Sequence, residues 1–212
     1  EIKLIPIDGI PLVKPGDDLP GIIIRIANAS KIEWIEGDIL VIAQKIISKA
    51  EGRLVNLKEI NPSKRAVELG YLTQKDPRLV ELILKESKKV IRHRKGVLVV
   101  QNHHGVILAN AGIDRSKLEQ DKEQDWVLLL PKDSDLSAKK IHQELFSKTG
   151  VHLGVIINDS IGRAWRKGTL GTAIGVAGIP SIIDLRGRKD LFGNPLRISE
   201  EAIADELASA AS

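Results

Sequence analysis

The sequence predicts an α+β fold with an irregular mixed α/β arrangement, and two observations lead to this prediction. Short apolar runs typical of buried strands and stretches with a helical period follow one another without strict alternation. The phosphate-binding motifs GxxxxGKS/T and GxGxxG after a strand do not occur in the chain. We therefore expect neither a P-loop nor a Rossmann sheet.

Length and composition limit the class of protein. With 212 residues, of which 42% are hydrophobic, the chain is long enough for a single domain over residues 1–212. This domain can consist of two subdomains. It has no cysteine, which excludes disulfides and thiolate zinc sites. No apolar run approaches the ~18 residues that a membrane span needs, so we expect a cytoplasmic protein without a membrane partner.

The charge of the chain argues against nucleic-acid binding. Its formal charge of +4 comes from 32 basic and 28 acidic residues that are mixed along the whole sequence. A nucleic-acid-binding protein typically shows a basic face or stripe instead. The balance is compatible with a small anionic substrate.

The first half of the chain predicts short elements separated by turns. Asp17 or Asp18 can cap a helix over 19–27 that has Pro20 in its first turn. The other elements expected here are strands at 2–7 and 39–43, a basic segment at 44–53 and a helix over 78–92.

The second half predicts a hairpin followed by strands and two helices. The hairpin pairs 97–100 with 106–108 around His103, His104 and Gly105. Residues 117–125 are charged and predict a mobile loop. The remaining elements expected are a helix over 134–149, strands near 151–157, 172–177 and 180–184, and an amphipathic helix that opens at 199–201.

The stretch NDSIGRAWRKGTLGTAIG, residues 158–175, is the main functional signal. Asp159 and Ser160 follow an apolar run that predicts a buried strand, and Arg163 and Arg166 come shortly after them. A carboxylate and a hydroxyl suit a hard divalent cation, and arginines suit the phosphates that such a cation binds. This stretch predicts phosphate chemistry with a metal.

Polar clusters at 10–18, 44–53, 110–117 and 159–168 all end apolar runs, so Asp114 and Asp159 can converge on one Mg²⁺ or Mn²⁺ ion. Simpler interpretations stay open. Either aspartate can be a helix cap or turn former. Lys45 and Lys49, four residues apart, can form a solvated helix face. The histidine pair can be the tip of its hairpin, and Trp165 can pack on the surface or line a pocket.

Taken together, these segments resemble the coenzyme F420-0:L-glutamate ligase family. The matching blocks include IPLVKPGDD from Ile10, QKIISKAEGR from Gln44, NAGIDRS from Asn110 and NDSIGRAWR from Asn158. Further matching blocks lie at 129–138, 173–178, 184–187 and 202–207, so the resemblance runs in order over nearly the whole chain.

The resemblance implies a GTP-dependent ligase that adds L-glutamate to F420-0 through γ-linked amide bonds. It implies an acyl-phosphate intermediate, a pair of Mg²⁺ or Mn²⁺ ions, K⁺ as a further cation, and a homodimer. The bound cations would neutralise the transferring phosphoryl group. Two alternatives remain: the same mechanism on another carboxylate substrate, and an inactive nucleotide- or F420-binding protein.

The resemblance also implies roles for individual residues. Asp114, Asp159 and Ser160 match metal ligands, Ser160 standing where the family usually has threonine. Lys49, Arg163 and Arg166 are the candidate catalytic residues, and for the two arginines a role in holding phosphate is our hypothesis. The matching guanine-nucleotide contacts are Ile10, Pro11, Leu12, Val13, Gln44, Lys49 and Lys117.

The chain departs from the family pattern in a few places. Lys117 replaces the usual asparagine, Ala164 a common proline, and Thr172 a common aspartate. The sequence also ends at Ser212, before the usual C-terminal extension of the family. Of these departures, Lys117 and the missing extension concern the nucleotide site.

Overall fold

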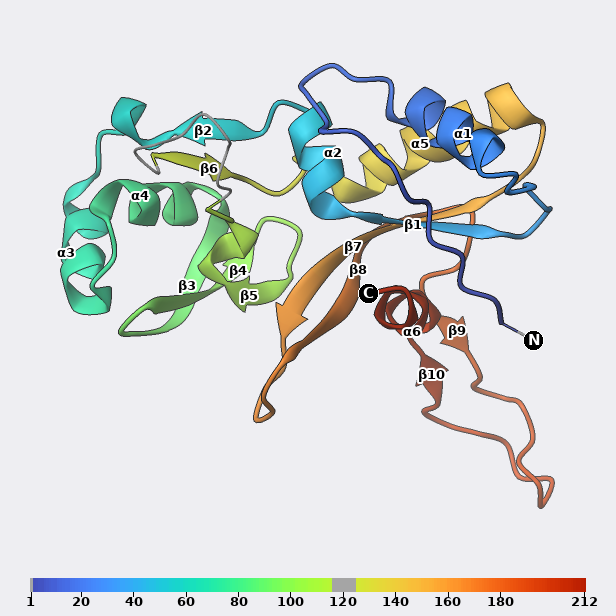
Figure 1. Ribbon diagram of the computed structural model, residues 1–212. Coiled ribbons are helices and arrows are strands. Elements are labelled where there is room, and N and C mark those ends of the chain that lie inside the picture. The colour runs from blue at the N-terminus through green and yellow to red at the C-terminus, as the bar shows by residue number, and fades with distance from the viewer. Residues whose placement is uncertain (1, 116–124) are drawn as a thin grey trace.

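The computed structural model describes residues 2–115 and 125–212 and shows a mixed α+β chain (Figure 1). The helices are α1 Leu19–Ala29, α2 Gln44–Ala50, α3 Lys64–Thr73, α4 Pro77–Lys85, α5 Ser134–Thr149 and α6 Ile203–Ala210, with 3₁₀ turns η1 Leu57–Glu59 and η2 Asn110–Gly112. The strands are β1 Ile39–Ala43, β2 Leu54–Asn56, β3 Ser87–Arg94, β4 Val97–Asn102, β5 Ile107–Ala109, β6 Trp126–Leu128, β7 Gly154–Gly162, β8 Thr169–Ala177, β9 Ile183–Asp184 and β10 Glu200–Glu201.

The strands form several small sheets and not one large sheet. One sheet has the order β1-β7-β8, with β1 parallel and β8 antiparallel to β7. Another, fully antiparallel, has the order β3-β4-β5. β2 pairs with β6, and β9 with β10. The predicted α+β class with irregular topology is confirmed.

The sheet around β7 is buried on both faces, which explains its nearly continuous apolar run. Val155 and Ile157 pack in the cluster that α1, α2 and α5 cover. Ile156 points to the other face, where it packs against α6. Because side chains alternate along a strand, Asp159 lies on the same face as Val155 and Ile157, toward α2.

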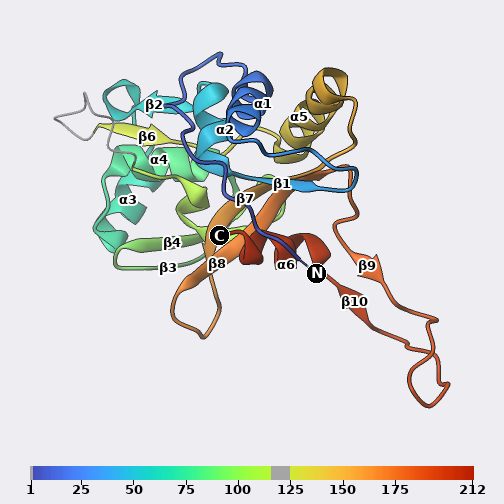
Figure 2. The same ribbon diagram turned by 45° about the vertical axis from the view of Figure 1, so that its right-hand side comes forward.

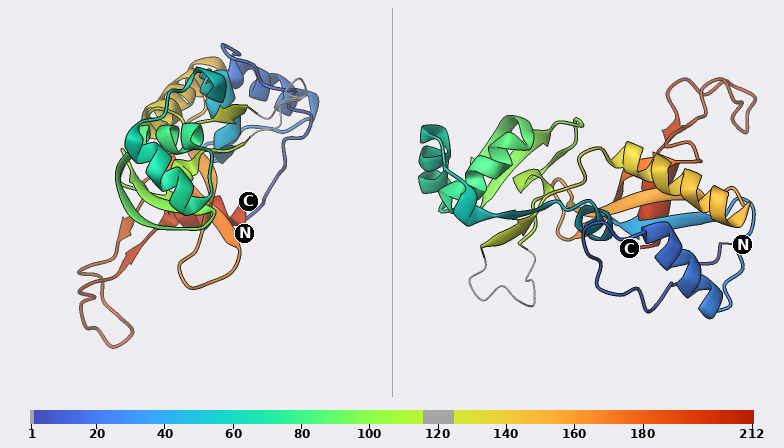
Figure 3. Two further views of the ribbon diagram at one scale, coloured as in Figure 1. Left: turned by 90° about the vertical axis from the view of Figure 1, so that its left-hand side faces the viewer. Right: turned by 90° about the horizontal axis from the view of Figure 1, so that it is seen from above.

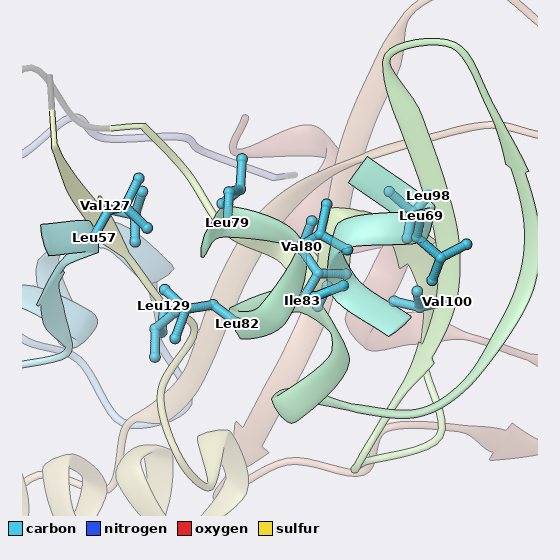
Figure 4. Packing of buried hydrophobic residues seen from close by; sticks show 12 residues of the cluster. Leu57, Leu69, Leu79, Val80, Leu82, Ile83, Leu98, Val100, Val127 and Leu129 are labelled. Carbon is cyan, nitrogen blue, oxygen red and sulfur yellow. The ribbon is translucent and has the colours of Figure 1, made fainter. Parts of the chain in front are cut away.

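A separate apolar cluster joins α3 and α4 to β4, β6 and η1 (Figure 4). Val80, Ile83, Leu98, Val100 and Val127 in it are fully buried. The helix α4 contributes Leu79, Val80, Leu82 and Ile83 to this cluster, since its apolar residues recur at helical spacing on one face. Seen from above, this part of the chain lies beside the part built on β7 (Figure 3).

Several sequence predictions agree with the structure. Asp18 caps α1, where its side chain accepts a hydrogen bond from Gly21 N, and Pro20 stands in the first turn. The predicted strand at 39–43, the hairpin around His103-His104-Gly105 and the helix over 134–149 are also present. In each case local caps, turns and periodicity suffice to specify the element.

Two of the predicted elements are wrong. Residues 2–7 form no strand: they are mostly exposed and have no strand partner among the described residues. The helix predicted over 78–92 ends at Lys85, and the chain continues as β3 because Ser87–Arg94 pairs with β4. Tertiary strand pairing thus overrides the local helical period. The loop predicted at 117–125 falls, up to residue 124, outside the described residues.

Other boundaries are corrected. β7 continues to Gly162, so Asp159 and Ser160 lie inside a strand and not at its end. The strand predicted at 180–184 is the short β9, and 200–201 form β10, so the last helix begins only at Ile203.

Residues 183–201 form an arm that projects from the body of the molecule (Figure 2). At its base β9 pairs with β10, and Arg186 bridges Asp184 and Glu200. Leu191, Phe192 and Ile198 are each more than 85% exposed. No helix within the described residues is long and apolar enough to cross a membrane.

Candidate active site

Among the carboxyl groups of the described residues, that of Asp159 is the one with a raised pKa. Burial raises the pKa of this carboxyl above its ordinary value. The N–H of Ser160, at 2.9 Å from Asp159 Oδ1, and the ammonium of Lys45 lower it, while the negative charge of Asp114 raises it. The effect of burial on the pKa is larger than the effects of the hydrogen bond and of Lys45, so the surroundings do not fully stabilise the ionised form of Asp159.

Asp114 lies close to Asp159, although 45 positions separate the two in the sequence. The Nζ of Lys45 is 2.6 Å from Asp114 Oδ2, in a pair with both side chains partly exposed. The structure therefore brings two carboxylates and one ammonium together where β5 and α2 lie against β7. This convergence of Asp114 and Asp159 was predicted from the sequence.

The position of Lys45 follows from the direct junction of β1 and α2. β1 ends at Ala43 and the helix begins at the next residue, Gln44. Gln44 is buried, and its Oε1 accepts a hydrogen bond of 3.0 Å from Ser48 Oγ. With this side chain fixed inside, the next residue of the helix projects at the end of the sheet, where Lys45 meets Asp114.

The position of Asp114 depends on an unusual turn. Asn110, Ala111 and Gly112 all have positive φ, of 53°, 55° and 71°. For a non-glycine residue this conformation costs roughly 1–2 kcal/mol, and such strain often occurs at functional sites. Asn110 is held by its side chain, which accepts a hydrogen bond from Leu98 N, and Asp114 is fixed by two backbone hydrogen bonds to Leu128.

The predicted nucleotide contacts lie around α2. Ile10 and Val13 pack partly against the cluster under that helix, whereas Leu12 is 71% exposed and Pro11 is exposed. Gly16 N donates to Ala50 O at 2.8 Å, which ties this loop to the end of α2. Lys49 lies one helical turn after Lys45 and is half-buried.

The remaining predicted residues differ in their position. Ser160 is exposed on β7 next to Asp159. Arg163 and Arg166 lie in the exposed loop between β7 and β8, where Arg163 donates to the carbonyl of Lys167. Arg163 is four residues from Asp159, about 13 Å along a strand, and among the described residues neither arginine forms an ion pair with Asp114 or Asp159. Lys117 lies outside the described residues.

Lys45 is the residue that sequence reasoning missed as a member of the site. As one of two lysines spaced by four, it also fits a solvated helix face. A signal was nevertheless present, since Lys45 lies two residues after the apolar strand β1, as Asp159 lies two residues after the apolar run that ends at Ile157. Only the packing of β5 beside β7 shows that its partner is Asp114.

The donor atoms fit a hard divalent cation. Among the described residues, no three histidine, cysteine, aspartate or glutamate side chains gather to hold a metal. Mg²⁺, however, needs only one or two carboxylates when water and substrate phosphates complete its shell. Asp114 and Asp159 supply two carboxylates, and the ammonium of Lys45 already shows that this position attracts positive charge. Ser160 is the next residue along β7, so its hydroxyl projects from the opposite face of the strand.

Comparison with known proteins places the chain in a family. The model of the F420-0:Gamma-glutamyl ligase family matches residues 9–212. Relatives that carry the name Coenzyme F420:L-glutamate ligase include proteins of three organisms. The protein of Methanothermobacter thermautotrophicus is 46% identical over 211 residues, which cover 100% of this chain and 82% of the relative.

The other two relatives show similar identity. The protein of Methanocaldococcus jannaschii is 47% identical over 176 residues, covering 83% of this chain and 69% of the relative. That of Archaeoglobus fulgidus is 40% identical over 208 residues, covering 98% and 80%. The resemblance of the motifs is thereby confirmed, and the chain belongs to the F420-0:gamma-glutamyl ligase family.

Proposed function

We propose that this protein is a GTP-dependent ligase that joins L-glutamate to F420-0 through γ-linked amide bonds. Family membership supports the ligase activity and its substrates. The observation that carries the reaction type is the half-buried carboxyl of Asp159, with its raised pKa, beside Asp114 and Lys45. Such an under-compensated carboxylate pair is suited to a cation that accompanies a nucleotide phosphate.

In the proposed reaction the carboxylate of F420-0 attacks the γ-phosphorus of GTP, and GDP leaves with the electron pair of the broken P–O bond. The amine of glutamate then forms a C–N bond to the acyl carbon. The acyl C–O bond breaks, phosphate leaves with its electrons, and the amine releases a proton to solvent. The proposed intermediate is thus an acyl phosphate, and the net products are amide, GDP and phosphate.

The residues of the chain have distinct roles in this proposal. Asp114 and Asp159 hold Mg²⁺ or Mn²⁺, which when bound neutralises phosphate charge. Lys45 and Lys49 lie one helical turn apart on α2, so both ammonium groups can meet a polyphosphate. The loop from Ile10 to Val13, fixed beside α2, and the buried Gln44 fit the purine side of the nucleotide site. K⁺ remains a further expected cation, to which no described group is assigned.

We further propose that the protein is a homodimer. The arm 183–201 exposes Leu191, Phe192 and Ile198, large apolar side chains that a monomer gains nothing from exposing. Arg163 and Arg166 lie in a second projecting loop, about 13 Å from Asp159 along β7. In a dimer these arginines can contribute to a phosphate site.

The test is incubation with F420-0, GTP, L-glutamate and Mn²⁺, followed by mass spectrometry of the products. We expect F420-0 to gain one or more glutamyl units, with one GDP for each unit. If GTP is cleaved only when another carboxylate compound takes the place of F420-0, the protein is a ligase of the same mechanism with a different substrate. Binding of GTP without any cleavage would instead identify a nucleotide-binding protein.

A further inference from the structure

A pocket of about 340 Å³ lies where the chain passes between its two parts. Its walls come from Arg53 after α2, from residues 130–132 before α5, from the turn 102–104, and from Glu86 and Ala111. Ligand sites favour such junctions, and their volumes run from about 300 to 1,000 Å³. The size suits a small ligand such as an amino acid better than a nucleotide.

The guanidinium of Arg53 is a fixed cation in this pocket. Its Nε donates to Leu130 O at 2.9 Å and its Nη2 to Glu86 Oε2 at 3.0 Å, and the side chain is 22% exposed. Its Nη1 has no partner among the described residues. A planar donor held from one side in this way can bind a carboxylate with the other.

Asn102 is a second oriented donor, only 6% exposed. Its Oδ1 accepts hydrogen bonds from His104 N at 3.0 Å and Val106 N at 2.9 Å. The side-chain amide orientation is therefore fixed, and its Nδ2 donates to no group in the described part of the chain. An amide N–H₂ that is fixed in orientation and lies in a pocket wall can donate to a ligand that accepts hydrogen bonds.

Acceptors for an ammonium group lie in the same pocket. His103 Nε2 is 2.8 Å from Lys85 O, and His104 Nε2 is 2.8 Å from Lys132 O. Since carbonyl oxygens accept, each Nε2 carries a proton, and Nδ1 is the ring nitrogen that can accept a hydrogen bond. Together with Glu86, the pocket combines donors for carboxylates with acceptors for an amine.

The pocket also adjoins the carboxylate site. Ala111 lines it, and Asp114 follows only three residues later, so the two Cα atoms are at most about 10 Å apart. The strained turn at 110–112 thus connects pocket and carboxylates directly.

We infer that this pocket binds the amino-acid substrate, a zwitterion with two carboxylates, and this inference depends on the proposed ligase function. Arg53, Asn102 and Lys132 face its carboxylates, while Glu86 and the histidines receive its ammonium group. The site for L-glutamate is therefore separate from the nucleotide loop at Ile10–Val13.

The test measures kinetic constants of Arg53→Lys and Lys132→Gln, with Lys140→Gln on the exposed face of α5 as control. We expect KM for L-glutamate to rise about tenfold, as loss of one charge-assisted contact predicts. KM for GTP and for F420-0 should stay unchanged, as should every constant of the control. An unchanged KM for glutamate, or a raised KM for F420-0 instead, would overturn the assignment.

Glutarate has both carboxylates of L-glutamate but lacks the amine. Comparing the two ligands on the same variant gives a test in which a loss of stability affects both equally. Glu86→Gln, whose side-chain oxygen can still accept the hydrogen bond from Arg53, should weaken L-glutamate binding about tenfold relative to inhibition by glutarate, because only L-glutamate has an ammonium group that loses the charge of Glu86. Equal weakening of both ligands would contradict the predicted orientation and the pocket assignment with it.

Failure of the proposed function can be told apart from failure of this inference. If the protein forms no product, NMR titration with ¹³C-labelled L-glutamate still reports binding. Binding that is lost in Arg53→Lys and kept in Lys140→Gln would support the pocket. Absence of binding to the unmodified protein would overturn it.

Discussion

Two groups of charged side chains in this protein shift the pKa of a carboxyl group in opposite directions. In the first, the guanidinium of Arg78 lies 2.7 Å from Asp76 and 3.2 Å from Asp125. Its hydrogen bonds hold the pKa of the Asp76 carboxyl below the ordinary value. In the second, Asp159 has a raised pKa because burial outweighs the charge of Lys45. In the first group hydrogen bonds and opposite charge stabilise the ionised carboxyl, and in the second burial outweighs them.

The difference separates a structural role from a functional one. Asp76 also caps α4, where it accepts a hydrogen bond from Arg78 N, so its charge stabilises the fold. Asp159 gains little stability from being ionised. A carboxylate that costs the fold stability and lies beside another is a candidate functional group on physical grounds.

The largest expected effect is that of Asp159→Asn on turnover. We expect ligase activity to fall about 100-fold or more, because the cation loses a carboxylate that its charge requires. The melting temperature should not fall, since a buried, poorly compensated charge is removed. Activity assays and thermal melts check this, with Glu144→Gln on the surface of α5 as the control. Full activity in Asp159→Asn would rule out the site.

Arg78→Ala should lower the free energy of unfolding by about 2 kcal/mol, because it leaves two partly buried carboxylates side by side. Denaturant titration measures the loss. KM for GTP and the dependence on Mn²⁺ should stay as they are, since the substitution lies outside the site. A change in Mn²⁺ dependence without loss of stability would contradict the structural role assigned to Arg78 and its two aspartates.

Lys45→Met tests whether the ammonium occupies the position of a cation. Without nucleotide, we expect Mn²⁺ to bind several-fold more tightly, because Lys45 no longer competes for Asp114 at 2.6 Å. Calorimetric titration gives the affinity. Lys49→Met, one turn further along the same helix, is the matched control and should leave Mn²⁺ affinity unchanged while weakening GTP binding.

The smallest expected effect is a pH dependence that involves Asp76. Since its folded pKa is lowered, its contribution to stability is complete above the unfolded value of about 3.9 and is lost as pH falls through the folded value. Arg78→Ala, which removes the main cause of the shift, should therefore lose less stability than the unmodified protein on acidification below pH ~4. Parallel acid-unfolding curves for the two proteins would contradict this attribution.

Local physical chemistry made much of this protein predictable from its sequence. Asp18 and Pro20 specify the start of α1, and the apolar run before Asn158 specifies a buried strand, because caps and periodicity act over a few residues. The types of residue at Asp114, Asp159 and Ser160 likewise indicate a hard cation, since carboxylate and hydroxyl oxygens are its ligands wherever the chain places them.

Other features were decided only by the tertiary structure. Residues 87–94 have a helical period in part, but pairing with β4 makes them a strand. Lys45 became part of the site because β5 and α2 pack against β7, a contact between segments far apart in the sequence. Arg53, Asn102 and Glu86 meet in one pocket for the same reason. Burial and distance across the fold set these contacts and the pKa of Asp159, and neither quantity exists along an unfolded chain.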